Sequence, residues 1–299
     1  MEYRDNARID QSRVRYGGGG RARGGGGGRG RGVAVGGGVG GVVVLLLVLL
    51  LGGNLGDLGG LVDGGTQDQG QAPQEQPQCT GEVGDVDLEA NPECRWALYD
   101  TALYNYWSET VRDFEPALQQ LYSGQISTAC GTGSSQMGPF YCPADHTIYL
   151  DSEFMGKLLN QLGAEGGEAA ELYIVGHEYG HHISNLTGQL QQGRQGEQSG
   201  PTSGQVRLEL QADCYAGVFF NNTLQDPSSP IEAVTSDDLR RIVEAARAVG
   251  DDHIQQQQGG DVVPESWTHG SSEMRQRWVT MGFESGDPNV CDTFGTDDL

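Results

Sequence analysis

Positive charge is scarce beyond residue 32 of this 299-residue chain. The net charge is −23, yet residues 1–32 hold eight arginines against three acidic residues, which leaves this segment at +5 and the remainder at −28. Nucleic acids bind to basic faces, and an acidic surface repels their phosphates. The composition therefore argues against nucleic acid as the main partner.

Charge of either sign is missing between Arg31 and Asp57. Within this interval, residues 33–51 are all glycine, alanine, valine or leucine, and a segment of this length suits a helix that spans a hydrocarbon core. No small-x-small cleavage motif follows Leu51, which favours an uncleaved anchor over a signal peptide. Arginines before the segment and acids after it predict a cytoplasmic N-terminus, with the bulk of the chain outside.

The composition divides the chain into four parts. Residues 1–32 are rich in arginine and glycine, and we expect them to be a disordered cytoplasmic tail. Residues 33–53 are the expected transmembrane anchor. Residues 54–78 are rich in glycine, glutamine, aspartate and proline, which is typical of a flexible linker. Residues 79–299 then form the folded domain.

No CxxC pair occurs among the six cysteines, which argues against a structural zinc ribbon or a redox motif. All six follow the apolar segment, and their even number fits disulfide bonds made in an oxidising compartment. Spacing does not settle which of the fifteen possible pairings forms. Because two close pairs leave one distant pair, we expect Cys79–Cys94, Cys130–Cys142 and Cys214–Cys291.

Alternating apolar patterns are few, so we expect an α+β fold that is predominantly helical. A short alternating run, Thr147–Leu150, predicts a strand. Apolar residues at helical spacing predict helices over 93–114, 116–124, 152–163, 166–187, 204–222 and 236–257.

The segment IVGHEYGHH holds the candidate site. His177 and His181 are four positions apart, so on a helix their side chains share one face and can bind one metal ion. Glu178 would project toward a water molecule at that ion. Gly176 and Gly180 lower the helix propensity, which indicates close packing over this helix or space for a substrate.

The HExxH spacing alone arises by chance in many proteins, so the third ligand decides. The long form of the motif requires a histidine at position 187, which is Thr187 here. The other common solution takes a glutamate from a later helix. Glu209 and Asp213 share one face of the largely apolar helix expected over 204–222, where carboxylates are costly unless a cation or hydrogen bonds satisfy them. We expect Glu209 to bind zinc and Asp213 to accept a hydrogen bond from a ligating histidine. The alternative is that this helix face is solvated and that Glu209 pairs with Arg207 or with water.

A hydrolase also needs a donor for the charge that develops on the carbonyl oxygen. The segment SWTHGSSEMRQRW offers His269, six residues before Arg275. A lone histidine is often a surface residue, but beside the other motifs His269 is a candidate for this role. His146, His182 and His253 are not expected to take part.

The motifs HEYGH, ELQAD and THGSSEMR together resemble the gluzincin pattern of HExxH, ExxxD and a downstream TH-x5-R. The longer blocks VGHEYGHHISNLTG, RLELQADCYAGVF and THGSSEMRQRWVTMGFESGDPNVCDTF are similar to a bacterial family of neutral zinc metallopeptidases. That family also begins with a short charged tail and one hydrophobic segment. The resemblance implies a zincin-like metallopeptidase domain behind a single N-terminal transmembrane helix, anchored in the bacterial cytoplasmic membrane.

Carried over by position, the resemblance implies that His177, His181 and Glu209 bind Zn2+. It implies that Glu178 is the catalytic base and that His269 is a second catalytic residue. Asp213 and Arg275 would lie behind the ligands and support them.

A zinc-activated water would then hydrolyse a peptide bond of a peptide or protein substrate, with Glu178 as general base. Thr147–Leu150, as an edge strand, would align the extended substrate. Two alternatives stay open: a non-catalytic zinc-containing binding module of the cell envelope, and a hydrolase of a non-peptide amide. Glu178 argues against the first because a structural zinc ion needs no base.

Overall fold

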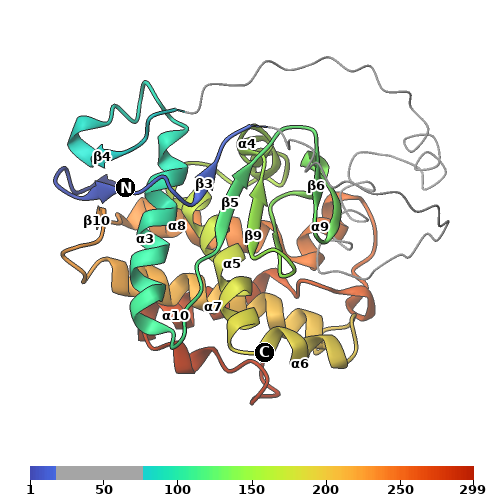
Figure 1. Ribbon diagram of the computed structural model, residues 1–299. Helices are drawn as coiled ribbons and strands as arrows, with labels where there is room; N and C mark the ends of the chain where they lie inside the picture. The colour runs from blue at the N-terminus through green and yellow to red at the C-terminus, as the bar shows by residue number, and fades with distance from the viewer. Residues whose placement is uncertain (18–76) are drawn as a thin grey trace, which may run out of the picture.

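The computed structural model describes residues 1–17 and 77–299 (Figure 1). The fold is mainly helical, with short strands gathered on one side. The helices of the described part are α3 (Cys94–Thr110), α4 (Ser152–Gln161), α5 (Glu168–Leu186), α6 (Gln189–Gln195), α7 (Gly204–Thr223), α8 (Ser236–Ala248), α9 (Asp251–Gln257) and α10 (Ser272–Ser285). The strands are β1 (Glu2–Tyr3), β2 (Arg8–Ile9), β3 (Val14–Arg15), β4 (Gly81–Glu82), β5 (Leu118–Leu121), β6 (Gln125–Thr128), β7 (Gly131–Ser134), β8 (Phe140–Cys142), β9 (Thr147–Leu150) and β10 (Ile231–Ala233).

The largest sheet has four strands in the order β3-β5-β9-β8. The pairs β3–β5 and β5–β9 are parallel, and β8 pairs antiparallel with β9. Because β9 has a neighbour on each side, Thr147–Leu150 is a central strand, and the expectation of an edge strand is wrong. The outer strand on that side is β8, and both β8 and β9 pack near α5.

Residues 116–124 were expected to be helical, but they contain strand β5. Buried Gln119 and Leu121 alternate with half-buried Leu118 and Gln120, which is the two-residue period of a strand. Partners on both edges supply backbone hydrogen bonds to this strand. This pairing with distant residues outweighs the local helical spacing.

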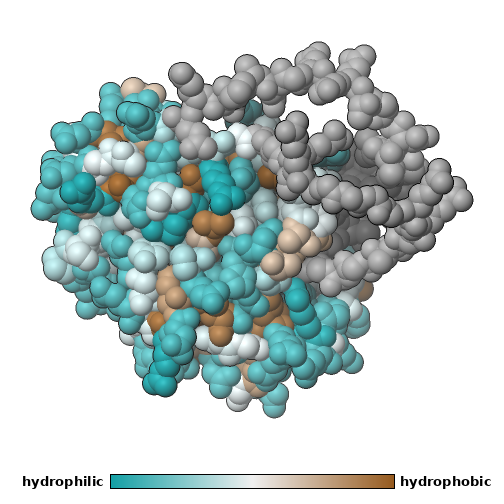
Figure 2. Space-filling model, in the orientation of Figure 1, coloured by the Kyte–Doolittle hydropathy of each residue, from teal (hydrophilic) through white to brown (hydrophobic). Residues whose placement is uncertain are grey.

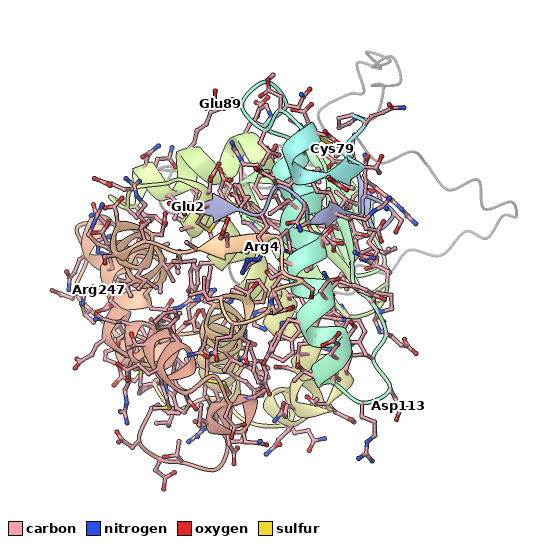
Figure 3. The ribbon with its side chains drawn as sticks, turned by 90° about the vertical axis from the view of Figure 1, so that its left-hand side faces the viewer. Glu2, Arg4, Cys79, Glu89, Asp113 and Arg247 are labelled. Atoms are coloured by element: carbon pink, nitrogen blue, oxygen red, sulfur yellow. A yellow bond between two sulfur atoms is a disulfide. The ribbon has the colours of Figure 1, made fainter. Side chains whose placement is uncertain are left out.

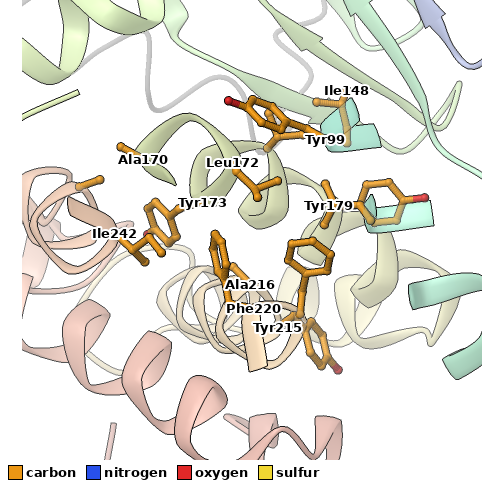
Figure 4. Packing of buried hydrophobic residues seen from close by; sticks show 14 of the residues in the cluster. Tyr99, Ile148, Ala170, Leu172, Tyr173, Tyr179, Tyr215, Ala216, Phe220 and Ile242 are labelled. Atoms are coloured by element: carbon orange, nitrogen blue, oxygen red, sulfur yellow. The ribbon is translucent and has the colours of Figure 1, made fainter. Parts of the chain in front are cut away.

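Helix α7 lies at the centre of the domain, between α5 on one side and α10 on the other. Nearly every residue of α7 is buried. Figure 4 shows the same packing around α5: Tyr173 lies on the side of Ile242 from α8, and Tyr179 lies on the opposite side. Helix α5 is therefore held from several directions.

The helix expected over 236–257 is broken into α8 and α9 at Gly250. A Cβ atom on Gly250 would lie 2.4 Å from the backbone nitrogen of Ser272, so the start of α10 fills that space. The break turns the chain and begins α9 at Asp251.

The three disulfides join the cysteines that were expected to pair. Cys79–Cys94 links the start of residues 77–299 to α3, and Cys130–Cys142 links the turn after β6 to strand β8. Cys214–Cys291 links α7 to the C-terminal turn.

Residues 1–17, here called the arm, fold against residues 77–299, here called the body. Strand β1 pairs with β10, β2 pairs with β4, and β3 pairs with β5. Figure 3 shows Glu2 and Arg4 on the arm beside β10. The expectation of a disordered tail is therefore wrong for residues 1–17, because Ile9 and Val14 are buried in the core. The rest of that tail and most of the predicted linker, 54–78, lie outside the described residues.

The pairing of the arm with the body places both on one side of any membrane. A single crossing between residues 17 and 77 would put them on opposite sides, so the single-pass arrangement with the N-terminus inside and the domain outside is wrong. Within 1–17 and 77–299, no helix combines the length and apolar character that a membrane span requires. The predicted anchor, 33–53, lies outside the described residues.

The surface of the described part is mostly polar. The face in Figure 2 is largely hydrophilic, with apolar side chains in small separate patches. Among all the described residues, the exposed large apolar side chains are Val262 and Val263. Most apolar side chains of the described residues are therefore buried inside.

Candidate metal centre

Two helices bring three ligand side chains together. His177 and His181 project from α5, and Glu209 projects from α7, which packs against it. The His177 Nε2 atom lies 3.1 Å from Oε2 of Glu209, and the His181 Nε2 atom lies 3.5 Å from Oε1 of Glu209. One ligand atom from each residue lies within 4.8 Å of the others, and all three residues are buried.

These separations fit a tetrahedral zinc ion. With Zn–N and Zn–O bonds of about 2.0–2.1 Å, neighbouring ligand atoms are about 3.3 Å apart. The observed distances of 3.1 and 3.5 Å lie on either side of that value, and they run from the two histidines to the two different oxygens of Glu209. Two imidazoles and one carboxylate also match the donor set of catalytic zinc sites, which keep a fourth position for water or substrate.

Gly180 allows the two ligand helices to approach closely. A Cβ atom there would lie 2.8 Å from Cα and 2.9 Å from the carbonyl oxygen of Ala212 on α7. A Cβ atom on Gly176 would lie 3.5 Å from Cβ of Ala216, which is ordinary contact. Gly180 is therefore needed for helix packing beside the ligands, and Gly176 is not.

Asp213 lies behind His177 and is completely buried. Its Oδ1 atom accepts hydrogen bonds from His177 Nδ1 at 2.8 Å and from the Tyr173 hydroxyl at 2.5 Å. Arg275 donates from Nε to Oδ2 at 2.7 Å and from Nη2 to Oδ1 at 2.8 Å. Three side chains therefore converge on this carboxylate.

Arg275 acts on His177 through Asp213. Its Nη2 atom also lies 3.2 Å from Nδ1 of His177. A guanidinium only donates, and a ring nitrogen that donates to Asp213 cannot accept from it. The shorter contact with Asp213 therefore assigns the Nδ1 proton, and this leaves Nε2 facing Glu209 for the metal.

The charges of this group stabilise one another. Burial alone would raise the pKa of Asp213, but Arg275 and then His177 hold it below its usual value. Burial lowers the pKa of His177, whereas Asp213 and then Glu209 raise it, to about 9. A metal ion held by Nε2 would therefore compete with a proton for His177.

Glu178 lies between the two histidines in sequence and is buried, with 8% of its surface exposed. Burial raises the pKa of the Glu178 carboxyl, and His181 and His177 oppose the rise. A carboxylate whose pKa is moved toward neutrality suits the work of a general base.

Gln205 holds the third ligand from one turn earlier on α7. Its Nε2 atom donates to Oε1 of Glu209 at 3.0 Å. A carboxylate only accepts, so the amide NH₂ must face it. With Oε1 engaged in this way, Oε2 is the oxygen closest to His177.

His269 lies in the loop before α10 and is oriented by Asp251 at the start of α9. Its Nδ1 atom lies 3.2 Å from Oδ1 of Asp251 and 3.0 Å from the Thr268 hydroxyl. The other Asp251 oxygen accepts backbone N–H groups from Thr268, His269 and Gly270. Burial lowers the pKa of His269, but Asp251 and then the nearby Glu209 raise it above its usual value.

The structure thus brings His177, His181 and Glu209 together, with Asp213 and Arg275 bonded behind His177. Glu178 interacts electrostatically with both histidines, and His269 with Glu209. The other three histidines lie elsewhere. His182 bonds the Tyr141 hydroxyl and the carbonyl oxygen of Glu115, and His253 bonds the carbonyl oxygen of Leu162. His146 lies 3.5 Å from the Glu115 carboxylate.

Three contributors were missed by the sequence analysis: Tyr173, Gln205 and Asp251. Tyr173 precedes His177 by four positions and Gln205 precedes Glu209 by four, so helical spacing was an available signal for both. Asp251 had no such signal, because its contact with His269 depends on the break at Gly250.

The profile of a protein family described as "Putative neutral zinc metallopeptidase" matches residues 1–294. The chain belongs to this family. Its membership supports zinc as the metal and a hydrolase as the enzyme class. The match covers the arm as well as the metal centre.

Uncharacterized relatives in two bacteria support the assignment to the neutral zinc metallopeptidase family. A Mycobacterium tuberculosis protein is 46% identical over 212 residues, which are 69% of this chain and 72% of the relative. The Escherichia coli K12 protein YpfJ is 39% identical over 259 residues, which are 83% of this chain and 84% of YpfJ. No solved structure matches the chain.

Proposed function

We propose that this chain is a zinc-dependent peptidase in which Glu178 is the general base and His269 is the donor to the developing oxyanion. The observation that carries the proposal is Glu178, a buried carboxylate that follows His177 and belongs neither to the three-residue ligand set nor to the hydrogen bonds behind it. A structural zinc site has no use for an additional buried carboxylate, which is costly to keep.

The protein groups have separate tasks in this proposal. When bound, zinc supplies Lewis-acid chemistry that acidifies a water molecule and polarises a carbonyl group. Glu178 takes the proton from that water and passes it to the leaving amine. Protonated His269 donates a hydrogen bond to the carbonyl oxygen as negative charge develops there. Asp213, fixed by Arg275 and Tyr173, keeps the His177 ring in place.

Substitution of the base separates metal binding from catalysis. We expect Glu178→Gln to bind as much zinc per chain as the wild type, because Glu178 is not a ligand, and to lose on the order of 10²–10⁴-fold in kcat. The measurement pairs zinc content with hydrolysis of a denatured protein and a peptide library, using the full chain produced under oxidising conditions. The matched control is Glu197→Gln, an exposed glutamate, which should keep full activity.

Two results would contradict the proposal. If the wild type binds zinc but cleaves no peptide and no other amide, the centre is a non-catalytic zinc module. If it cleaves a cell-wall amide but no peptide, the roles of the residues stand and the substrate class is wrong.

A further inference from the structure

No disulfide joins the arm to the body, which the chain connects to it through residues 18–76. Residues 1–17 contain no cysteine. Their backbone pairs with β4, β5 and β10, which are far apart in the sequence. Ile9 and Val14 are buried in the core that the body also forms. Among the described residues, the arm therefore lies on a surface that the body provides, here called the arm site.

Arg13 is the main polar anchor of the arm. Its Nε atom donates to Oδ2 of Asp100 on α3 at 2.8 Å, and its guanidinium lies 3.8 Å from the ring centre of Tyr104. Asp100 is completely buried, and Gln119 is its other side-chain donor. Burial raises the pKa of Asp100 to about 7, and Arg13 is the chief group that opposes this rise. Removal of the arm would leave a buried carboxylate without its cation.

The arm also reaches the helix that carries the metal ligands. The Tyr3 hydroxyl donates to Glu168 in the first turn of α5 at 2.9 Å. Asp100, the partner of Arg13, lies on α3, where the hydroxyl of its neighbour Tyr99 donates to Glu171 of α5 at 3.1 Å. The arm therefore reaches the first turn of α5 directly and also through α3.

We propose that the body binds the arm as a separable, non-covalent element, and that an arm whose Arg13 pairs with Asp100 is required for tight zinc binding. A cut within residues 18–76 then leaves a two-piece protein that stays assembled and keeps its metal. A second copy of residues 1–17 can replace the first. This inference stands whether or not the centre cleaves peptides.

The first experiment cuts the full chain after folding. Residues 66–71 are replaced with the recognition sequence of a site-specific protease, and the cut protein is analysed by native mass spectrometry. We expect the arm to remain with the body and the zinc affinity to stay within about twofold of the uncut chain. If the arm separates and the body still binds zinc as tightly, the proposal is overturned.

The second experiment measures exchange and needs no variant of the body to fold. A labelled peptide of residues 1–17 is mixed with the cut protein, and unlabelled peptides compete with it. The Arg13→Ala peptide should compete on the order of 100-fold more weakly, because it leaves Asp100 buried and unpaired. The Arg15→Ala peptide is the matched control, since Arg15 is exposed on the same strand, and it should compete as the parent does. Equal competition by all three peptides would overturn the proposed recognition.

The third measurement tests whether the arm bound at the arm site changes the zinc affinity. Zinc affinity is measured on the cut protein while the excess of Arg13→Ala peptide over parent peptide is increased. We expect zinc affinity to fall as the parent arm is displaced and to recover when the parent peptide is returned. Zinc affinity that is unchanged across this series would contradict the link between the arm and α5.

Discussion

Gln205 orients the carboxylate of the ligand Glu209. Its amide engages Oε1, and groups of this kind behind a ligand typically change metal affinity 10- to 100-fold when removed. We expect Gln205→Met to weaken zinc binding by about that factor, with little change in the folded structure. Competition with a zinc chelator measures this. Gln192→Met, at an exposed position on α6, is the control, and an equal effect of both variants would contradict the role of Gln205.

Asp251 should determine the pH range in which His269 can donate. An isolated histidine has a pKa near about 6.5, and Asp251 raises that of His269, so the protonated donor persists to higher pH. We expect Asp251→Asn to move the alkaline limb of the kcat profile to lower pH. Asp261→Asn, at an exposed site, should leave the profile unchanged. If Asp251→Asn lowers kcat equally at every pH and leaves the alkaline limb in place, Asp251 only supports the loop.

The same pair has a predictable effect on stability. The pKa of His269 is higher in the folded state than in an unfolded chain, so the His269–Asp251 pair stabilises the fold fully below about pH 6.5. That contribution is lost as the pH rises through the raised pKa. Denaturant unfolding of the metal-free protein at several pH values should show the loss in the wild type and a smaller one in Asp251→Asn.

Ligand residues were predictable because their spacing is local. His177 and His181, and likewise Glu209 and Asp213, each occupy one face of one helix, so a sequence pattern suffices to bring each pair together. Arg275 and His269 required the resemblance to a known family. Asp251 was not predictable, because helical periodicity continues across Gly250 and hides the break that brings Asp251 to His269.

At the scale of elements, the distance between α5 and α7 depends on one glycine. Gly180→Ala would force its Cβ atom against the backbone of Ala212, and overpacking of this kind costs about 1–3 kcal/mol. We expect lower unfolding free energy and weaker zinc binding. Gly176→Ala is the matched control, because its Cβ atom has room and alanine favours a helix by up to about 1 kcal/mol. Unfolding and chelator titrations of both variants test this, and equal losses would contradict it.

The two ligand-bearing helices were predicted better than the strands, whereas α10, which packs on α7, was not predicted. Helices α5 and α7 were placed within two residues of their ends, because their length and apolar content are local properties. Strand β5 was predicted as a helix, and β9 was placed at an edge. Both errors concern strand partners, which are residues distant in sequence that no local pattern identifies.

At the scale of the whole molecule, the Cys214–Cys291 disulfide closes the longest loop. It joins residues 77 positions apart, compared with 12 for Cys130–Cys142. Loop-closure entropy predicts losses of about 4 and about 3 kcal/mol on replacing each pair with alanines. Because Cys214 follows Asp213 on α7, we expect only the first double variant also to weaken zinc binding. Denaturant unfolding and chelator competition provide the two measurements, and a stronger zinc effect from the second variant would contradict this.

The arm was the largest error of the sequence analysis. The glycine and arginine content of residues 1–32 is typical of disorder, and that description was extended over residues 1–17 as well. The arm has a few apolar residues, Ile9 and Val14 among them, which are too few to predict a fold alone. Their partners lie in the body, and pairing with the body rather than composition gives the arm its structure.

The β1–β10 pairing also sets an order of events during synthesis. Tyr3 pairs with Ile231, about 230 positions later, so the ribosome must add that length before the contact can form. At about 5–20 residues per second this takes roughly 10–50 seconds. Helices α5 and α7 emerge within that interval, while the arm still lacks its final strand partner. Strand β3 and Arg13 gain their partners at β5 and Asp100 about 110 positions earlier, so the arm is completed in two stages and its first residues are the last to pair.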